Sequence, residues 1–164
     1  MPTYSTMPSV TDGMVELSDG VAGPVLDKDR LFKSIFRISN LLTPQANQDE
    51  ILAKILDELV DAVGFDRGII RLCDETQQYL VTKVVKNYRE EEAIRAFSTP
   101  LNIKEHDCLA TKVARTGDMI MIRNAATDPR ITPMDRTLTN IVGRGSIVCT
   151  PLKIGDYVIG ILAA

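Results

Sequence analysis

The apolar period of this sequence changes at Gly64, and this change limits the folds open to the chain more than any other feature. Before Gly64, apolar residues recur every three or four positions over about 29–42 and 47–63, which predicts two helices. After Gly64, short apolar runs flank polar turns and predict antiparallel hairpins. Helices followed mainly by hairpins predict an α+β domain, in which helices cover an antiparallel sheet.

The part of the chain after Gly64 divides into strands and short helices. Strands are expected over 67–73, 79–86, 99–103, 119–123, 146–154 and 157–162, and helices over 90–97, 107–116 and 134–142. Asn47 and Asp107 are the expected N-caps of the helices that they open, while Gly64 and Gly117 are expected to end them. The sequence therefore predicts an α+β fold with a central antiparallel sheet of about six strands and helices on both faces.

Glycine and proline inside the expected strands carry further backbone constraints. Glycine weakens the packing of a strand, so Gly68 and Gly160 are expected where another part of the chain approaches the backbone closely. Proline lacks an amide hydrogen, so Pro151 is expected at a sheet edge, at a strand end or at a bulge.

Length, charge and cysteine content narrow the class of protein. The 164 residues are enough for one domain, with 1–26 as a flexible lead-in and the domain itself over 27–164. A formal net charge of −3 gives no basic surface for nucleic acid, and no apolar stretch approaches the ~20 residues of a membrane span. The first basic residue is Lys28 and the three cysteines are scattered, so we expect a cytoplasmic protein without a secretory signal.

Several stretches of the sequence resemble the GAF domain family, and together they place about 29–164 within it. They are the stretches 63–72, 109–120, 128–130, 146–152 and 155–162, which occur in the family's order. The resemblance implies a GAF/PAS-like fold and a regulatory domain of a larger signal-transduction protein, with any enzymatic output outside this chain. Members usually continue into a C-terminal helix, which is expected to be missing here because the sequence ends at Ala164.

Ligands of the resembled family lie between the sheet and a cap of loops and helices, which corresponds here to about 105–142. The resemblance therefore implies that one set of residues lies near a pocket. These candidates are Cys108, Leu109, Val113, Asp128, Arg130, Met134, Leu138 and Ile141. A guanidinium binds anionic groups, so Arg130 is a candidate ligand contact. We favour the alternative that Asp128 and Arg130 organise their own loop, because Asp-Pro-Arg is a common turn composition.

The identity of a ligand or cofactor stays open. The N-K…F…D-E signature of the cyclic-nucleotide branch is absent, and 134–138 lack the cysteine that covalent bilin attachment requires. Haem would have to use His106, the only histidine, which is more simply a solvated loop residue. The three hypotheses that remain are, in order, a small-molecule sensor, a ligand-free dimerisation module and a thiol-dependent free methionine sulfoxide reductase.

The reductase alternative depends on Cys108, which lies near the position of one cysteine of that enzyme. Its remaining cysteine pattern is absent, since 118–145 contain no cysteine. The dimerisation alternative depends on the helix expected over 29–42, where Phe32 and Phe36 widen the apolar face beyond the stripe of Leu31 and Ile35. We expect a homodimer built largely on this helix.

Overall fold

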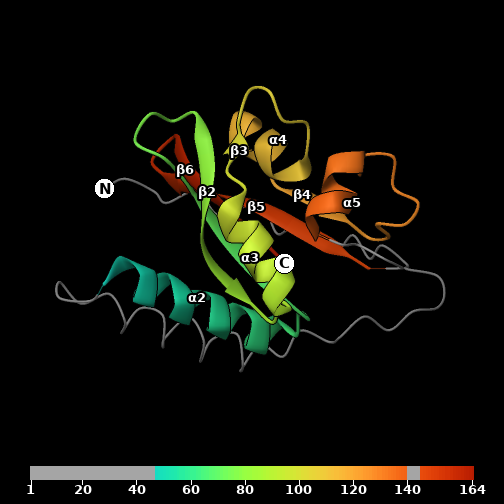
Figure 1. The fold of residues 1–164 in the computed structure, drawn as a ribbon, viewed down its shortest axis with the longest axis horizontal. Helices are drawn as coiled ribbons and strands as arrows, with labels where there is room; N and C mark the ends of the chain where they lie inside the picture. The colour runs from blue at the N-terminus through green and yellow to red at the C-terminus, as the bar shows by residue number, and fades with distance from the viewer. Residues whose placement is uncertain (1–46, 140–144) are drawn as a thin grey trace, which may run out of the picture.

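The computed structural model describes residues 47–139 and 145–164 (Figure 1). The lead-in expected over 1–26, the helix expected over 29–42 and the pocket candidate Ile141 lie outside these ranges. Within them, no helix has the length and apolar character needed to cross a membrane.

Six antiparallel strands form one sheet in the order β3-β2-β1-β6-β5-β4. Their bounds are β1 Gly68–Cys73, β2 Tyr79–Lys86, β3 Leu101–Asn102, β4 Ile120–Ile122, β5 Ile147–Ile154 and β6 Tyr157–Ala163. Each expected strand is present, although β3 and β4 are shorter than expected. The first and last of these six strands, β1 and β6, pair at the centre of the sheet.

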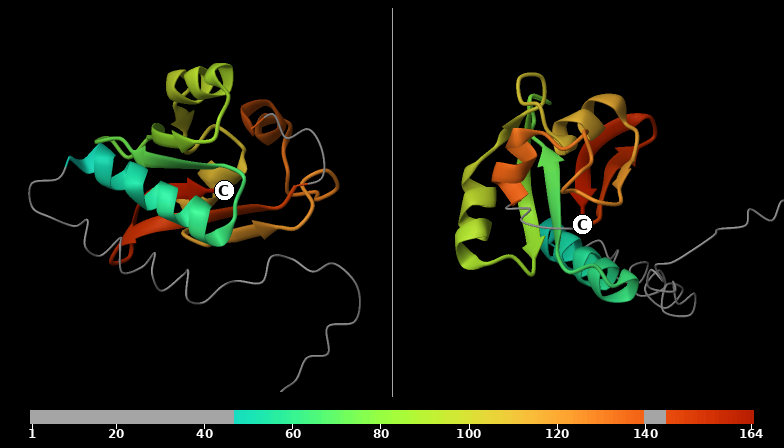
Figure 2. Two further views of the ribbon diagram at one scale, coloured as in Figure 1. Left: turned by 90° about the horizontal axis from the view of Figure 1, so that it is seen from below. Right: turned by 90° about the vertical axis from the view of Figure 1, so that its right-hand side faces the viewer.

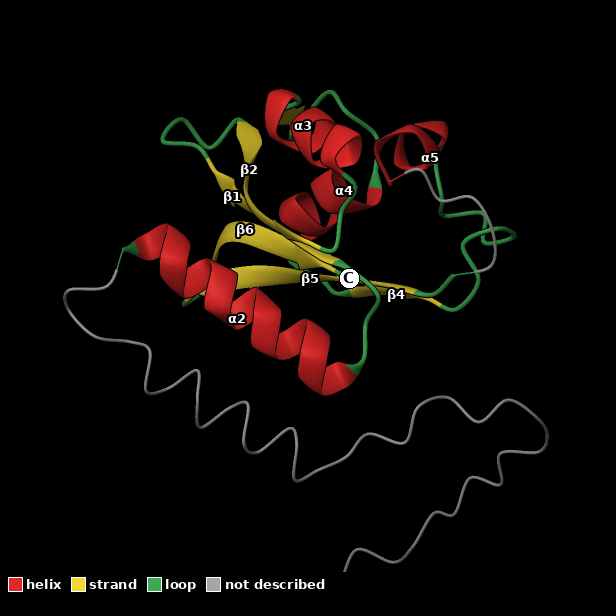
Figure 3. Ribbon diagram, turned by 60° about the horizontal axis from the view of Figure 1, so that its bottom comes forward, coloured by secondary structure: helices red, strands yellow, loops and turns green. Residues whose placement is uncertain are grey.

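Helices cover both faces of this sheet, so the predicted fold class is confirmed (Figures 2 and 3). On one face lies α2 (Gln48–Val63), whose Leu56 and Val60 are buried against β1 and β6. The opposite face is covered by α3 (Glu90–Ser98), α4 (Leu109–Thr116) and α5 (Pro133–Thr139). We call these three helices the cap.

The ends of α2 follow the sequence prediction. Asn47 is the N-cap, and its side chain accepts a hydrogen bond from the Asp49 N–H at 3.2 Å. Gly64 ends the helix in the left-handed conformation, with φ of +82°. Its N–H donates to the carbonyl oxygen of Val60 at 2.9 Å.

The start of α4 corrects the expected role of Asp107. Cys108 occupies the N-cap position, and its N–H donates to the Thr111 hydroxyl at 3.3 Å. The next N–H, that of Leu109, donates to the carboxylate of Asp135 on α5 at 2.9 Å. A carboxylate from another helix therefore satisfies the N-terminus of α4, which is why Asp107 is not needed as its cap.

Gly68, Gly160 and Pro151 have the surroundings in the sheet that the sequence predicts for them. A Cβ added to Gly68 would lie 2.7 Å from Leu56 Cδ1, and one added to Gly160 would collide with the backbone oxygen of Arg71. Pro151 lies in β5 beyond its pairing with β4, which ends at Cys149. At Pro151 the strand is a local edge, so its missing N–H leaves no gap in the ladder.

Alternation along β1 decides which side chains reach each face. Ile70 and Leu72 pack with the α2 cluster, whereas Ile69 and Arg71 lie on the cap side. The pairing of β1 with β2 shifts by one residue between Ile70 and Arg71. Such bulges re-aim a side chain, and here Arg71 lies at the bulge.

Candidate functional site

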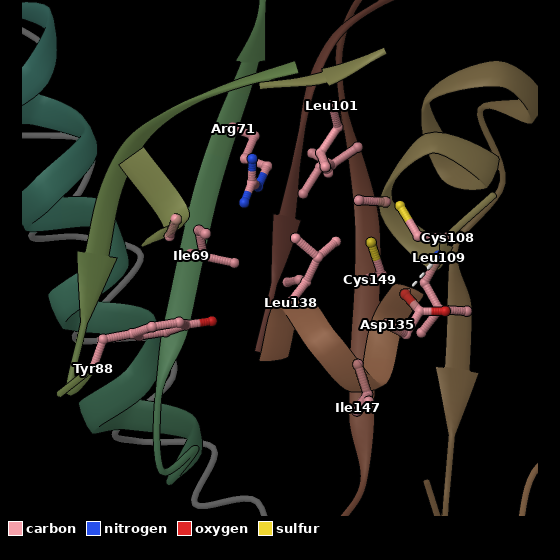
Figure 4. A pocket seen from close by; sticks show the side chains of 14 residues that line it. Ile69, Arg71, Tyr88, Leu101, Cys108, Leu109, Asp135, Leu138, Ile147 and Cys149 are labelled. Atoms are coloured by element: carbon pink, nitrogen blue, oxygen red, sulfur yellow. Dashed lines mark hydrogen bonds between the residues drawn. The ribbon is translucent and has the colours of Figure 1, made fainter. Parts of the chain in front are cut away.

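A cavity of about 60 Å³ lies between the sheet and the cap, and Figure 4 shows its walls. A cavity needs ~10–15 Å³ to hold one water, so this space exceeds the gaps of ordinary close packing. Its lining is mostly apolar and comes from both sides. The lining residues are Ile69, Arg71, Tyr88, Ala96, Leu101, Cys108, Leu109, Ala110, Asp135, Leu138, Ile147, Cys149, Ile161 and Ala163.

Arg71 is the buried cation of this cavity. It is only 4% exposed, and its guanidinium points into the cavity from β1 (Figure 4). Nη1 donates to the backbone oxygen of Thr99, at the end of α3, at 3.0 Å. Burial lowers the pKa of Arg71, although an arginine remains protonated in proteins. Within 47–139 and 145–164, no carboxylate forms an ion pair with it.

Tyr88 brings a second hydrogen-bond donor to the cavity, from the segment between β2 and α3. The Arg67 guanidinium lies over its ring, 5.1 Å from the centroid, and also pairs with Glu92 at 3.4 Å. The ring is thereby oriented with its hydroxyl toward the cavity (Figure 4). Burial raises the pKa of Tyr88, so the phenol keeps its proton at neutral pH. That hydroxyl has no hydrogen-bond partner among the residues that the structure describes.

Asp135 lies on the opposite wall and is only 4% exposed. One carboxylate oxygen accepts from the Leu109 N–H, and the other accepts from the N–H and the hydroxyl of Thr132, all at 2.9 Å. The carboxylate thus fastens α5 and its preceding loop to the start of α4. It is a structural clamp of the cap whose oxygens are already hydrogen-bonded.

Two thiols complete the wall beside Asp135. Cys108 and Cys149 are each 1% exposed, and both belong to the apolar cluster beneath α4. Burial raises the pKa of Cys149 to about 12, so this group is a neutral thiol at physiological pH. Among the described residues, no three His, Cys, Asp or Glu side chains gather in a way that would hold a metal ion.

The structure divides the predicted pocket residues into three groups. Cys108, Leu109 and Leu138 line the cavity. Val113 of α4 is fully buried in the apolar cluster that contains Cys108 and Cys149, and Met134 packs against that cluster; neither residue lines the cavity.

Asp128 and Arg130 belong to a separate, shallow surface hollow beside β4. Arg130 donates from Nε and Nη2 to the two carboxylate oxygens of Asp128, at 2.9 and 2.6 Å. Nη2 also donates to the backbone oxygen of Met121 at 2.9 Å. These contacts hold the loop against β4, and they direct the guanidinium away from the cavity.

Sequence reasoning missed the polar residues of the cavity, namely Arg71, Tyr88 and Asp135. A signal existed for Arg71, because a lone charge inside the apolar run 69–73 marks a buried charge. A signal also existed for Asp135, because Thr132 precedes it at capping-box spacing. For Tyr88 no local pattern distinguishes a cavity residue from a surface tyrosine.

Known proteins resemble this chain both in sequence and in fold. The sequence model of the GAF domain family matches residues 45–164. The A. aeolicus nlh2 GAF domain in an inactive state superimposes with a TM-score of 0.65 and 17% identity, over 83% of this chain and 78% of that chain. For the free methionine-R-sulfoxide reductase of Neisseria meningitidis in complex with its substrate, the TM-score is 0.64 and the identity 16%, over 88% and 78% of the two chains. At such identities the likeness is one of fold.

A probable DNA ligase of Persephonella marina is similar in sequence over a shorter stretch. It is 34% identical over an alignment of 83 residues, and the match covers 42% of this chain. The present chain spans 14% of the length of that curated relative. This match therefore concerns a segment, and not the activity of the ligase as a whole.

Proposed function

Because this chain belongs to the GAF domain family, we propose that it is a regulatory domain that binds a small molecule between its sheet and its cap. The observation that carries the proposal is the cavity itself, which two separate layers line and into which the buried Arg71 and Tyr88 point. An ordinary core in this position would be filled by side chains at close packing. A larger signal-transduction protein would then use the bound state as its input.

The cap has the connections that would let a ligand act on all three helices together. Asp135 of α5 holds the N-terminus of α4, and Arg95 of α3 donates to the backbone oxygen of Thr137 on α5 at 3.4 Å. A ligand that contacts the sheet and the cap binds more tightly to one arrangement of the cap than to another. That difference in affinity shifts the population and constitutes the signal.

Native mass spectrometry of the purified chain, followed by thermal-shift screening, tests this function. A co-purifying mass, or a concentration-dependent rise in Tm with a small molecule, is the expected result. A chain that carries no bound mass and responds to no compound would instead be assigned to the ligand-free dimerisation module.

The reductase alternative is separated by a direct assay. If the chain were a thiol enzyme, it would consume free methionine sulfoxide, and Cys108→Ser would abolish the turnover. Our proposal predicts no turnover in either protein. The burial of Cys108, which is 1% exposed, supports this expectation, because a reactive thiol has to be accessible.

A further inference from the structure

We infer that the ligand of this cavity carries a small planar anionic group, a carboxylate or nitrate, which Arg71 and Tyr88 bind together. The inference rests on the proposed function, since it names the chemical class of the molecule that the cavity would take. It is carried by the unbalanced set of donors inside the cavity.

The first part of this set is the charge of Arg71. A buried cation is costly unless a negative charge or several acceptors compensate it. Arg71 is 4% exposed, and among the described residues a single backbone oxygen, that of Thr99, accepts from its guanidinium. A guanidinium has five N–H donors in a planar fork, so most of them have no acceptor within the described part of the chain. A planar oxyanion matches this fork with two parallel hydrogen bonds.

The second part is the hydroxyl of Tyr88, which reaches the same cavity from the neighbouring segment (Figure 4). Burial keeps the phenol protonated, so it donates. The acceptors of the opposite wall are already engaged, because the Asp135 carboxylate binds Leu109 and Thr132. Among the described lining residues, the cavity therefore offers donors on one side without matching free acceptors on the other, which favours an anion over a neutral or cationic molecule.

The size of the cavity also limits the ligand. About 60 Å³ accommodates a molecule of only a few heavy atoms, such as nitrate or the acid of a two- or three-carbon chain. The side chains of Leu101, Leu138 and Ile161 form an apolar wall that would contact a short alkyl group. Nucleotides, haem and bilins are far larger than this space.

Thermal-shift titration of the whole 164-residue chain tests the inference. The probes are sodium nitrate, acetate and pyruvate, with sodium chloride at matched ionic strength and acetamide as the neutral analogue of acetate. We expect at least one of the three anions to raise Tm by several degrees in a saturable manner, while chloride and acetamide have no such effect. A response to nitrate alone identifies an inorganic ligand, and a response to the carboxylates identifies an organic acid.

Three variants connect that response to the cavity. Arg71→Met keeps an unbranched apolar stem and removes the guanidinium with its charge, so the affinity for the responding anion should fall at least about tenfold. Tyr88→Phe removes one donor and should weaken binding about threefold to tenfold while the fold stays intact. Arg130→Ala removes an exposed guanidinium outside the cavity and should bind as the unaltered chain does. If Arg71→Met does not fold, Arg71→Lys and Tyr88→Phe carry the test.

Two results would overturn the anion inference and leave the sensor function standing. One is a neutral co-purifying molecule together with no response to any anion. The other is an anion response that both Arg71→Met and Tyr88→Phe retain in full. A chain that binds no small molecule of any class, by either mass spectrometry or thermal shift, would overturn the inference and the sensor function together.

Discussion

The Asp135 carboxylate accepts a hydrogen bond from the backbone N–H of Leu109 at 2.9 Å, so the last helix of the cap holds the first turn of α4. Both groups lie on the cavity wall. This contact joins residues that are 26 positions apart in sequence, and it connects α4 to α5.

We therefore expect Asp135→Ala to lower the free energy of unfolding by about 2–3 kcal/mol, because it leaves buried donors of Leu109 and Thr132 without an acceptor. Asp135→Asn retains a carbonyl oxygen and should lose less. Urea unfolding followed by circular dichroism measures the change. Asp156→Ala, in the exposed turn between β5 and β6, is the control and should stay within about 0.5 kcal/mol. Equal midpoints for the Asp135→Ala and Asp156→Ala variants would contradict the clamp.

Gly160→Ala should destabilise the domain strongly. The new Cβ would meet the backbone oxygen of Arg71 at the centre of the sheet, where β6 pairs with β1. Backbone cannot move aside as a side-chain tip can, so we expect a loss of about 3 kcal/mol or more, seen as a fall in Tm. Gly145→Ala has open space around it and is the matched control. A Gly160→Ala protein with unaltered Tm would show that the two strands do not approach as described.

Cys149 should resist alkylation in the folded chain. Its thiol is 1% exposed, and its pKa is raised to about 12, so both access and thiolate fraction are low at pH 8. Treatment with iodoacetamide followed by peptide mass spectrometry should find Cys149 unmodified until urea unfolds the domain. Rapid modification under native conditions would be the contrary outcome.

The effect of Arg130 on the pKa of Asp128 should be measurable by acid titration. The Arg130 guanidinium lowers the pKa of Asp128 from 3.8 to about 2. Because the folded pKa is depressed, the pair stabilises the fold above about pH 4, and this contribution is lost as the pH falls toward 2. NMR titration of the side-chain carboxyl should show the midpoint return toward 3.8 in Arg130→Ala. A midpoint that stays near 2 in Arg130→Ala would show that a group other than Arg130 lowers the pKa of Asp128.

Homodimerisation through the residues 29–42 remains a prediction from sequence, since these residues lie outside the described ranges. Sedimentation velocity over a range of concentrations measures it. We expect the unaltered chain to be a dimer. We expect Phe32→Glu and Phe36→Glu to dissociate this dimer, because a charge on the widened apolar face opposes burial of that face. A monomer at high concentration would defeat the prediction.

Local signals in the sequence determined which elements form and several of their ends. The change of period at Gly64 separates helix from sheet, and Asn47, Gly64 and Gly117 mark helix ends because capping and left-handed turns depend on residues only a few positions apart. Gly68 and Gly160 in the strands also marked positions where another part of the chain lies too close for a Cβ atom. For these reasons, the fold class followed from the sequence.

Only the tertiary structure decided the cavity. Its walls combine β1, α3, α4, α5, β5 and β6, and they meet because β6 returns to pair with β1, a choice made by packing over long separations. The carboxylate that accepts a hydrogen bond at the start of α4 likewise came from Asp135 on α5 instead of the adjacent Asp107. Sequence can mark Arg71 as a charge in an apolar strand, but the face on which it lies depends on the register that the whole sheet adopts.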